Sequence, residues 1–251
     1  MILLKSPQEI ETMATPGEIV GGAHRKVREA LRPGMTTGEL DQLVEDYIRS
    51  QGGKPAFKGY QGFPASVCAS VNEEVVHGIP GKRVLEDGDI VGVDIGVQAQ
   101  GFYGDAAQTL AVGSASAEAE QLMKVTREAL FAGIEQAVAG NRIGDISHAV
   151  QTRVEADGFS VVRTLVGHGI GRSMHEDPQV PNFGPAGKGA QLKPGMVLAI
   201  EPMVNTGGPD VDVLDDQWTV VTRDGSLSAH FEHTVVITED GPVILTDGAV
   251  A

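Results

Sequence analysis

The sequence is short of several residue classes, and each shortage narrows what the protein can be. One cysteine in 251 residues excludes an internal disulfide and fits a reducing compartment, so we expect a cytoplasmic protein. Lys and Arg number 19 against 34 Asp and Glu, and the net charge of −15 disfavours nucleic-acid binding because no positive field would attract a polyanion. No apolar run has the length of a membrane span or signal peptide, which predicts a soluble protein without a membrane partner.

A predicted hairpin over residues 90–112 contains two aspartates that could bind a metal ion. Its first half alternates apolar side chains with Gly and Asp, as a strand with one buried face does. With Ala99 and Gln100 as a two-residue loop, Asp94 would stand directly opposite Asp105. Facing carboxylates repel each other unless a cation or a shared proton lies between them, so this register predicts a metal site. The alternative is a bulge that shifts the register and leaves one Asp in solvent.

Capping signals mark two helices near the N-terminus. Ser6 with Glu9, and Thr36 with Glu39, have the spacing of capping boxes. The first predicted helix contains Pro16-Gly17, which we expect to kink or split it.

The second half of the chain repeats the pattern of the first. Residues 85–94 and 192–201 share the spacing of a glycine and of their apolar positions, and the alignment places Asp94 level with Glu201. Helix signals precede both segments in the same order. The repeat therefore predicts two related halves with a site between them.

Further acids and histidines interrupt the apolar segments. Glu201 follows one apolar run and Glu232 precedes another, and carboxylates in such places are rarely buried unless they are paired or bound to a metal. His168 lies among glycines that leave room for a ligand, although a buried His taken alone is usually a hydrogen-bonded core residue, and the same holds for His77. Neither a phosphate-binding loop, a serine nucleophile elbow nor an HExxH zinc helix is present, and Cys68 lacks the surroundings of a nucleophile.

Taken together, five segments make the chain resemble the type I methionine aminopeptidases over nearly its whole length. They read VNEEVVHGIP, DIGV followed by GFYGDAA, VGHGIGRSMHEDP, PGMVLAIEPM and SLSAHFEHT. The resemblance implies the α+β pita-bread fold, with an antiparallel sheet, helices packed outside and pseudo-twofold duplicated halves. We accordingly expect a single catalytic domain over residues 1–251, with halves of about 1–112 and 113–251.

The same resemblance implies the function and the site. We expect a cytoplasmic monomer that removes initiator methionine from nascent polypeptides when the second residue is small, with contact with the ribosome left open. The implied metal ligands are Asp94, Asp105, His168, Glu201 and Glu232. They would hold two divalent ions (Co, Mn, Fe or Zn) whose bound hydroxide attacks the peptide.

Three residues are implied to be catalytic. Glu201 would move a proton to the leaving amine, His175 would polarise the scissile carbonyl, and His77 would bond the peptide and the tetrahedral intermediate. The implied substrate-binding residues are His77, His175, Tyr60, Phe63, Cys68, Met174 and Trp218.

Two positions depart from the family pattern. Met174 stands where several relatives carry Phe, so one wall of the pocket should be softer. Gly96 stands where many carry Thr, so a hydroxyl that could contact the metal-bound water is missing. The alternative functions are a broader or proline-directed peptidase on the same scaffold and a non-catalytic binding protein. The short chain disfavours the first, and the complete ligand set disfavours the second.

Overall fold

Four α-helices, one 3₁₀ turn and fifteen strands form the part of the chain that the computed structural model describes, residues 1–250. The helices are α1 (Pro7–Ala30), α2 (Thr37–Ser50), α3 (Ala117–Glu135) and α4 (Ile143–Glu155), and the 3₁₀ turn is Tyr60–Gly62. The strands are β1 (Lys54–Pro55), β2 (Cys68–Val71), β3 (Glu74–Val76), β4 (Ile90–Ala99), β5 (Phe102–Ala111), β6 (Ser160–Val161), β7 (Gly167–Gly169), β8 (Glu176–Val180), β9 (Val197–Ile200), β10 (Met203–Asn205), β11 (Val211–Val213), β12 (Val220–Thr222), β13 (Ser228–His230), β14 (His233–Thr238) and β15 (Gly241–Ile244). None of these helices is long and apolar enough to cross a membrane.

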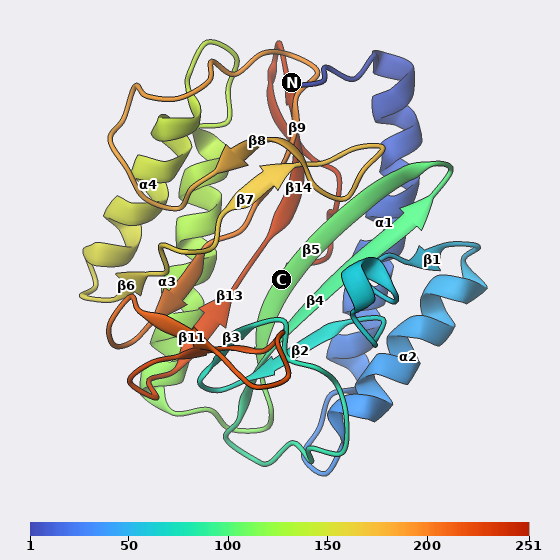
Figure 1. The fold of residues 1–251 in the computed structure, drawn as a ribbon, viewed down its shortest axis with the longest axis vertical. Coiled ribbons are helices and arrows are strands. Elements are labelled where there is room, and N and C mark those ends of the chain that lie inside the picture. The colour runs from blue at the N-terminus through green and yellow to red at the C-terminus, as the bar shows by residue number, and fades with distance from the viewer. Residues whose placement is uncertain (251) are drawn as a thin grey trace.

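The helices lie outside and the antiparallel sheets lie between them. In Figure 1 the pair α1–α2 covers one side, the pair α3–α4 covers the other, and strands β4, β5, β13 and β14 run between the pairs. One sheet follows the order β1-β4-β2 with β5 beside β4, and another follows the order β15-β14-β9-β7-β8. The expected α+β class with helices outside an antiparallel sheet is confirmed.

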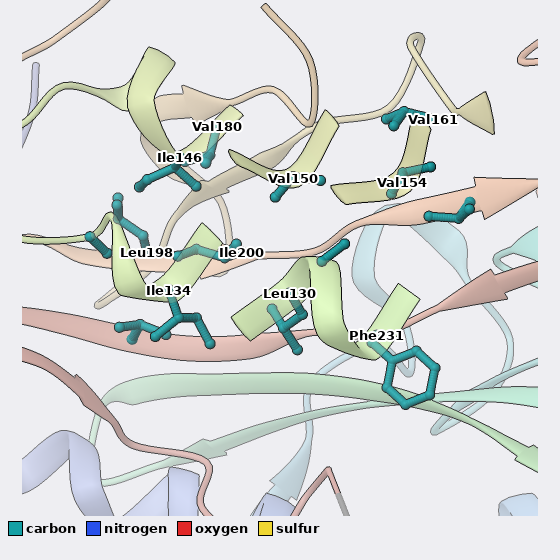
Figure 2. Close-up of a cluster of buried hydrophobic side chains, with 14 of the residues drawn as sticks. Leu130, Ile134, Ile146, Val150, Val154, Val161, Val180, Leu198, Ile200 and Phe231 are labelled. Atoms are coloured by element: carbon teal, nitrogen blue, oxygen red, sulfur yellow. The ribbon is translucent and has the colours of Figure 1, made fainter. Parts of the chain in front are cut away.

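Two large apolar cores are present, one built mainly from residues before 113 and the other mainly from residues after it. In the first half, Val91, Val93 and Ile95 of β4 are fully buried against helices α1 and α2, as their alternation predicted. In the second half, Figure 2 shows Leu130 of α3 and Val150 of α4 among the side chains of the neighbouring strands. The site-bearing strands therefore rest on two packed cores.

The helix starts agree with the sequence, but the predicted break does not occur. Both capping boxes are present, and α1 runs without interruption through Pro16. Gly17 serves a different purpose: a Cβ there would lie 2.1 Å from the backbone oxygen of Leu245. Glycine is required because the C-terminal segment approaches the helix closely. The predicted split does not occur, and the alternative, a kink at Pro16-Gly17, stays a prediction.

The central hairpin has a different register from the predicted one. Its loop is Gln100–Gly101, one residue later than expected, and both loop residues have positive φ (51° and 81°), which two-residue turns of type I′ require. Asp94 consequently pairs with Ala107, and Asp105 pairs with Gly96. The two carboxylates share one face as diagonal neighbours, so the prediction that they stand directly opposite was wrong.

A seam between β5 and β14 joins the two halves. At its centre Ala107 and Glu232 exchange two backbone hydrogen bonds, of 3.4 Å and 2.8 Å. On one side of this pair, the hydroxyl of Thr234 bonds both the backbone N–H and the carbonyl of Asp105 (3.0 and 2.8 Å). The seam therefore brings Asp105 of one half beside Glu232 of the other.

A second threonine has the same role on the other side of the central pair. The hydroxyl of Thr109 accepts from the backbone N–H of His230 at 2.9 Å and donates to the carbonyl of the same residue at 3.0 Å. Two threonines, one from each half, thus extend the seam with side-chain hydroxyls in place of backbone groups.

Candidate metal centre

A cavity of about 190 Å³ lies where the two halves meet. It is lined by Phe57, Tyr60, Gln61, Phe63, Cys68, His77, Asp94, Asp105, His168, His175, Glu201, Trp218 and Glu232. All five side chains predicted to bind metal are in this list, and so are both histidines expected to flank the substrate. One end of the cavity is acidic and the other is aromatic.

The acidic end is assembled from five separate places in the chain. Asp94 and Asp105 come from the central hairpin, and His168 comes from the short strand β7. Glu201 directly follows β9, and Glu232 directly precedes β14. Ligand atoms of Asp105, His168 and Glu232 all lie within 4.8 Å of one another, and the Nε2 atom of His168 is 3.6 Å from Oε1 of Glu201.

Close backbone packing explains the glycines beside His168. A Cβ at Gly167 would lie 2.4 Å from the carbonyl oxygen of Ala199, and one at Gly169 would lie 2.2 Å from that of Asp177. The glycines thus make room for the neighbouring strands rather than for a ligand, which corrects the reason given from the sequence. The Nδ1–H group of His168 donates to the carbonyl of Gly169 at 2.8 Å, so Nε2 carries the free lone pair.

Burial and mutual repulsion disfavour charge on the carboxylates. Burial and the neighbouring acids raise the pKa values of Asp94, Glu201 and Glu232 well above their ordinary range. Burial also raises the pKa of Asp105 to about 7. The pKa of His168 falls to about 4, chiefly through burial and secondly through the nearby His175. Burial thus disfavours negative charge on the four acids and positive charge on His168, so the imidazole does not neutralise the carboxylates.

The donor set fits divalent metal ions. The buried oxygens Oδ1 of Asp94, Oδ1 of Asp105 and Oε1 of Glu232 have no hydrogen-bond partner within residues 1–250. Buried polar atoms are nearly always satisfied, so these orphaned oxygens indicate that cations complete the site. Carboxylate oxygens with one imidazole suit ions from manganese to zinc.

The two histidines expected to flank the substrate, His77 and His175, also line the cavity. The ring of His175 is 4.3 Å from that of His168, centroid to centroid, and its Nδ1 atom shares a hydrogen bond of 2.7 Å with the hydroxyl of Tyr60. His77 has a positive φ of 59°, a strained conformation for a non-glycine residue that is common at functional sites. Burial lowers the pKa values of both His77 and His175, which keeps their rings neutral.

The aromatic end is built largely as the sequence predicted. Phe63 and Trp218 meet edge to face with ring centroids 5.1 Å apart. Cys68 is buried, and burial beside the carboxylates raises the pKa of its thiol, so it remains protonated and serves as a wall. Met174 is not among the lining residues of the cavity; it is 2% exposed and packs behind them, in the apolar cluster that includes Phe63 and Cys68.

Three residues at or behind the cavity were not predicted. Phe57 and Gln61 line it, and Phe57 forms a series with Tyr60 and Phe63 at a spacing of three that could have revealed it. The third residue, His230, lies behind the cavity wall. It stands two residues before Glu232, and that spacing in an extended chain puts both side chains on one side.

Comparison with known proteins identifies the family to which this cavity belongs. The model of metallopeptidase family M24 matches residues 11–239. The chain belongs to metallopeptidase family M24. It is therefore a hydrolase of a metallopeptidase family, and the expected relation to type I methionine aminopeptidases is confirmed.

Individual relatives of this M24 chain match it from end to end. A protein named methionine aminopeptidase 1 from Bacillus subtilis (strain 168) is 54% identical over 246 residues, which cover 98% of this chain and 99% of the relative. Methionine aminopeptidase from Escherichia coli (strain K12) is 44% identical, with coverage of 98% and 94%.

Solved structures confirm the pita-bread fold. The crystal structure of methionine aminopeptidase from Thermotoga maritima superposes with a TM-score of 0.96 at 51% identity, with coverage of 98% and 99%. The Xaa-Pro dipeptidase from Bacillus anthracis superposes with a TM-score of 0.79 at 22% identity, with coverage of 98% of this chain and 62% of that one. The second likeness shows a shared fold alone.

Proposed function

We propose that this M24 metallopeptidase removes N-terminal methionine from polypeptides whose second residue is small, with two divalent ions bound at the acidic end of the cavity. One observation carries the proposal. Five donor side chains from both halves line one partly open cavity, and the same cavity has an apolar wall that includes Phe63, Cys68 and Trp218. The similarity to proteins named methionine aminopeptidase supports the same substrate.

The five predicted ligands would hold the ions: Asp94, Asp105, His168, Glu201 and Glu232. When bound, divalent ions of this series polarise a carbonyl and lower the pKa of water to near neutrality, which is the chemistry that peptide hydrolysis needs. The identity of the ions is left to metal availability, because affinity alone does not decide it.

The chain's own residues would position the peptide and move its protons. Glu201, at the edge of the ligand set, would accept a proton from the attacking water and deliver it to the leaving amine. His175, held by Tyr60 at 2.7 Å, would donate a hydrogen bond to the scissile carbonyl. His77, fixed by its backbone conformation, would hydrogen-bond the peptide on the other side.

Selectivity for methionine would come from the aromatic end. Phe63, Trp218 and the protonated Cys68 present an apolar slot. A flexible thioether fits such a slot, and a sulfur–aromatic contact adds about 0.3–1.5 kcal/mol. An enzyme with this site would act on polypeptides whose N-terminal amine is free, nascent polypeptides with such an amine included. The cytoplasmic location, the monomeric state and any contact with the ribosome remain predictions from the sequence.

Release of methionine from short peptides tests this proposal. With Mn(II) or Co(II), the protein should release methionine from Met-Ala-Ser and spare both Met-Leu peptides and N-terminally blocked peptides. Activity should be lost in the Glu201→Ala and His168→Ala variants, with the folded state retained by circular dichroism. Equal release of leucine or proline would refute the proposed selectivity, and the absence of any divalent binding in calorimetry would leave only a binding protein.

A further inference from the structure

His230 is a fully enclosed imidazole directed at two of the proposed metal ligands. Its side chain is 4% exposed, and its Nε2 atom lies 3.9 Å from Oε2 of Glu201 and 3.9 Å from Oε2 of Glu232. That nitrogen has no hydrogen-bond partner in the described part of the chain. A buried ring nitrogen without a partner, equally distant from two carboxylates, is an unsatisfied group that calls for an explanation.

The backbone of His230 is fixed in place. The hydroxyl of Thr109 bonds both its N–H group and its carbonyl, and β13 pairs it with Met203 of β10. The next residue, Phe231, donates its N–H to the carbonyl of Pro202 at 3.3 Å. The segments that carry the two glutamates are thus joined at His230, so the backbone that carries its ring is held between them.

The ring lies behind the carboxylates and not in the cavity. Glu201 and Glu232 line the cavity, whereas His230 does not. An imidazole in this position is separated from the ions by the ligands themselves. It is suited to orient the ligand oxygens, which is the usual task of groups behind a metal site.

We propose that His230 is a positioning residue of the metal centre. Its neutral imidazole, protonated at Nε2, presents its N–H group to the outer oxygens of Glu201 and Glu232, each 3.9 Å away, so that their other oxygens are left to face the ions. This inference rests on the proposed metal site and deepens it by adding a residue behind two ligands from different parts of the chain. It also explains two observations together: the Nε2 atom has no hydrogen-bond partner in the described part of the chain, and the Thr109 hydroxyl makes two hydrogen bonds to the backbone of His230.

Calorimetric titration of metal-free protein with Mn(II) tests the proposal. The variants are His230→Leu, which removes the donor, His230→Asn, whose amide is too short to reach, and His230→Gln, whose amide reaches about as far as Nε2. We expect Leu and Asn to weaken Mn(II) binding about 10- to 100-fold, as losses of such supporting groups do, and Gln to restore it to within about threefold of wild type. The contrast between Asn and Gln decides the matter even if the Leu variant does not fold.

His233 provides a matched control. It is also a buried imidazole near the same strand end, but its Nδ1 atom bonds the hydroxyl of Thr246 at 2.8 Å and its ring meets Phe131. The His233→Leu variant should lose thermal stability and keep the wild-type affinity for Mn(II). If His230→Leu behaved in the same way, with unchanged affinity, His230 would be structural only and the inference would be overturned.

Cobalt spectroscopy separates positioning from direct ligation. The visible absorption bands of the Co(II) protein should keep their positions in His230→Leu, because the atoms bound to the ion are unchanged. A shift of these bands to a different ligand field would make His230 a ligand and overturn the positioning role. Wild-type protein that binds no Mn(II) at all would instead refute the proposed function, so the two failures are distinct.

Discussion

At the scale of single residues, the contact between Gly96 and Phe57 shapes the wall of the cavity. A Cβ added at Gly96 would lie 2.5 Å from Cε1 of Phe57, so the aromatic ring occupies the space that a side chain would need. Gly96 is also the strand partner of Asp105. Gly96 therefore faces a partner that the sequence did not reveal, an aromatic ring 39 positions earlier in the chain.

Adding one methyl group at Gly96 tests this contact. We expect Gly96→Ala to destabilise the protein by about 1–3 kcal/mol, because the ring cannot yield without disturbing the wall. Gly92→Ala is the matched control, since its Cβ would meet its nearest neighbour, Oγ1 of Thr109, at an ordinary 3.4 Å. Urea denaturation measures both, and the added Phe57→Ala change should relieve most of the loss at Gly96. Equal effects at the two glycines would contradict the account.

The sequence predicts side chains of this site well where a motif carries them. All five proposed ligands, together with His77 and His175, line one cavity as expected. Phe57 and His230 were missed because their roles depend on what they face, a glycine in one case and two carboxylates in the other. Local sequence does not contain such pairings across the fold.

At the scale of elements, the seam between β5 and β14 depends on threonine hydroxyls. The backbone N–H of Asp105 reaches its partner strand only through the hydroxyl of Thr234. That contact is buried, and Asp105 is itself one of the proposed metal ligands. The seam should therefore be sensitive to loss of a single oxygen atom.

Replacement of Thr234 by valine removes the hydroxyl at nearly constant shape. We expect Thr234→Val to cost about 1–3 kcal/mol, because it leaves buried backbone groups of Asp105 unpaired. Thr126→Val is the control: Thr126 is also buried, but its hydroxyl donates to the carbonyl of Leu122 within helix α3, so fewer groups lose a partner. Denaturant titration compares the two, and a Thr234 effect no larger than that at Thr126 would show that the seam does not need the hydroxyl.

Elements themselves were predicted more reliably than their alignment. Both capping boxes begin helices where expected, and the hairpin strands lie where their alternation placed them. The predicted strand register was wrong because the loop was placed one residue too early. A Gln-Gly turn with two positive φ angles is not apparent from composition. The reason for Gly17 was missed because the close approach of Leu245 is a tertiary contact.

At the scale of the whole molecule, the buried acids tie stability to pH. Metal-free folded protein should hold protons on Asp94, Asp105, Glu201 and Glu232 that the unfolded chain has already released, because their pKa values are raised on folding. Groups with raised pKa values stabilise the fold at low pH, and this stabilisation is lost as pH rises through the folded values. The pKa values of the buried histidines are lowered on folding, so they reduce the stability of the fold as the pH falls, and only below about pH 6.5.

Above about pH 6.5, the buried carboxyl groups should therefore determine how the stability of the fold changes with pH, without a contribution from the histidines. We expect the melting temperature of EDTA-treated protein to fall as the pH rises from about 6.5 through the pKa of about 7 that Asp105 has in the folded protein, and added Mn(II) to remove most of that fall by balancing the charges. Differential scanning calorimetry measures both series. A metal-free melting temperature that stays level or rises across this range would contradict the placement of four acids in one buried cluster.

The division of the chain into one catalytic domain with halves of about 1–112 and 113–251 stays a prediction, but the seam gives it a physical meaning. Asp94 and Asp105 come from one half, and His168, Glu201 and Glu232 come from the other. Neither half supplies a complete donor set. A metal centre of this kind can form only when both halves are folded and joined.

Anomalous X-ray diffraction from a manganese-soaked crystal is the most direct test of the proposed metal centre. We expect two peaks of anomalous density among Asp94, Asp105, His168, Glu201 and Glu232, at the acidic end of the cavity. Density confined to surface carboxylates, with those five side chains directed to separate places, would contradict it.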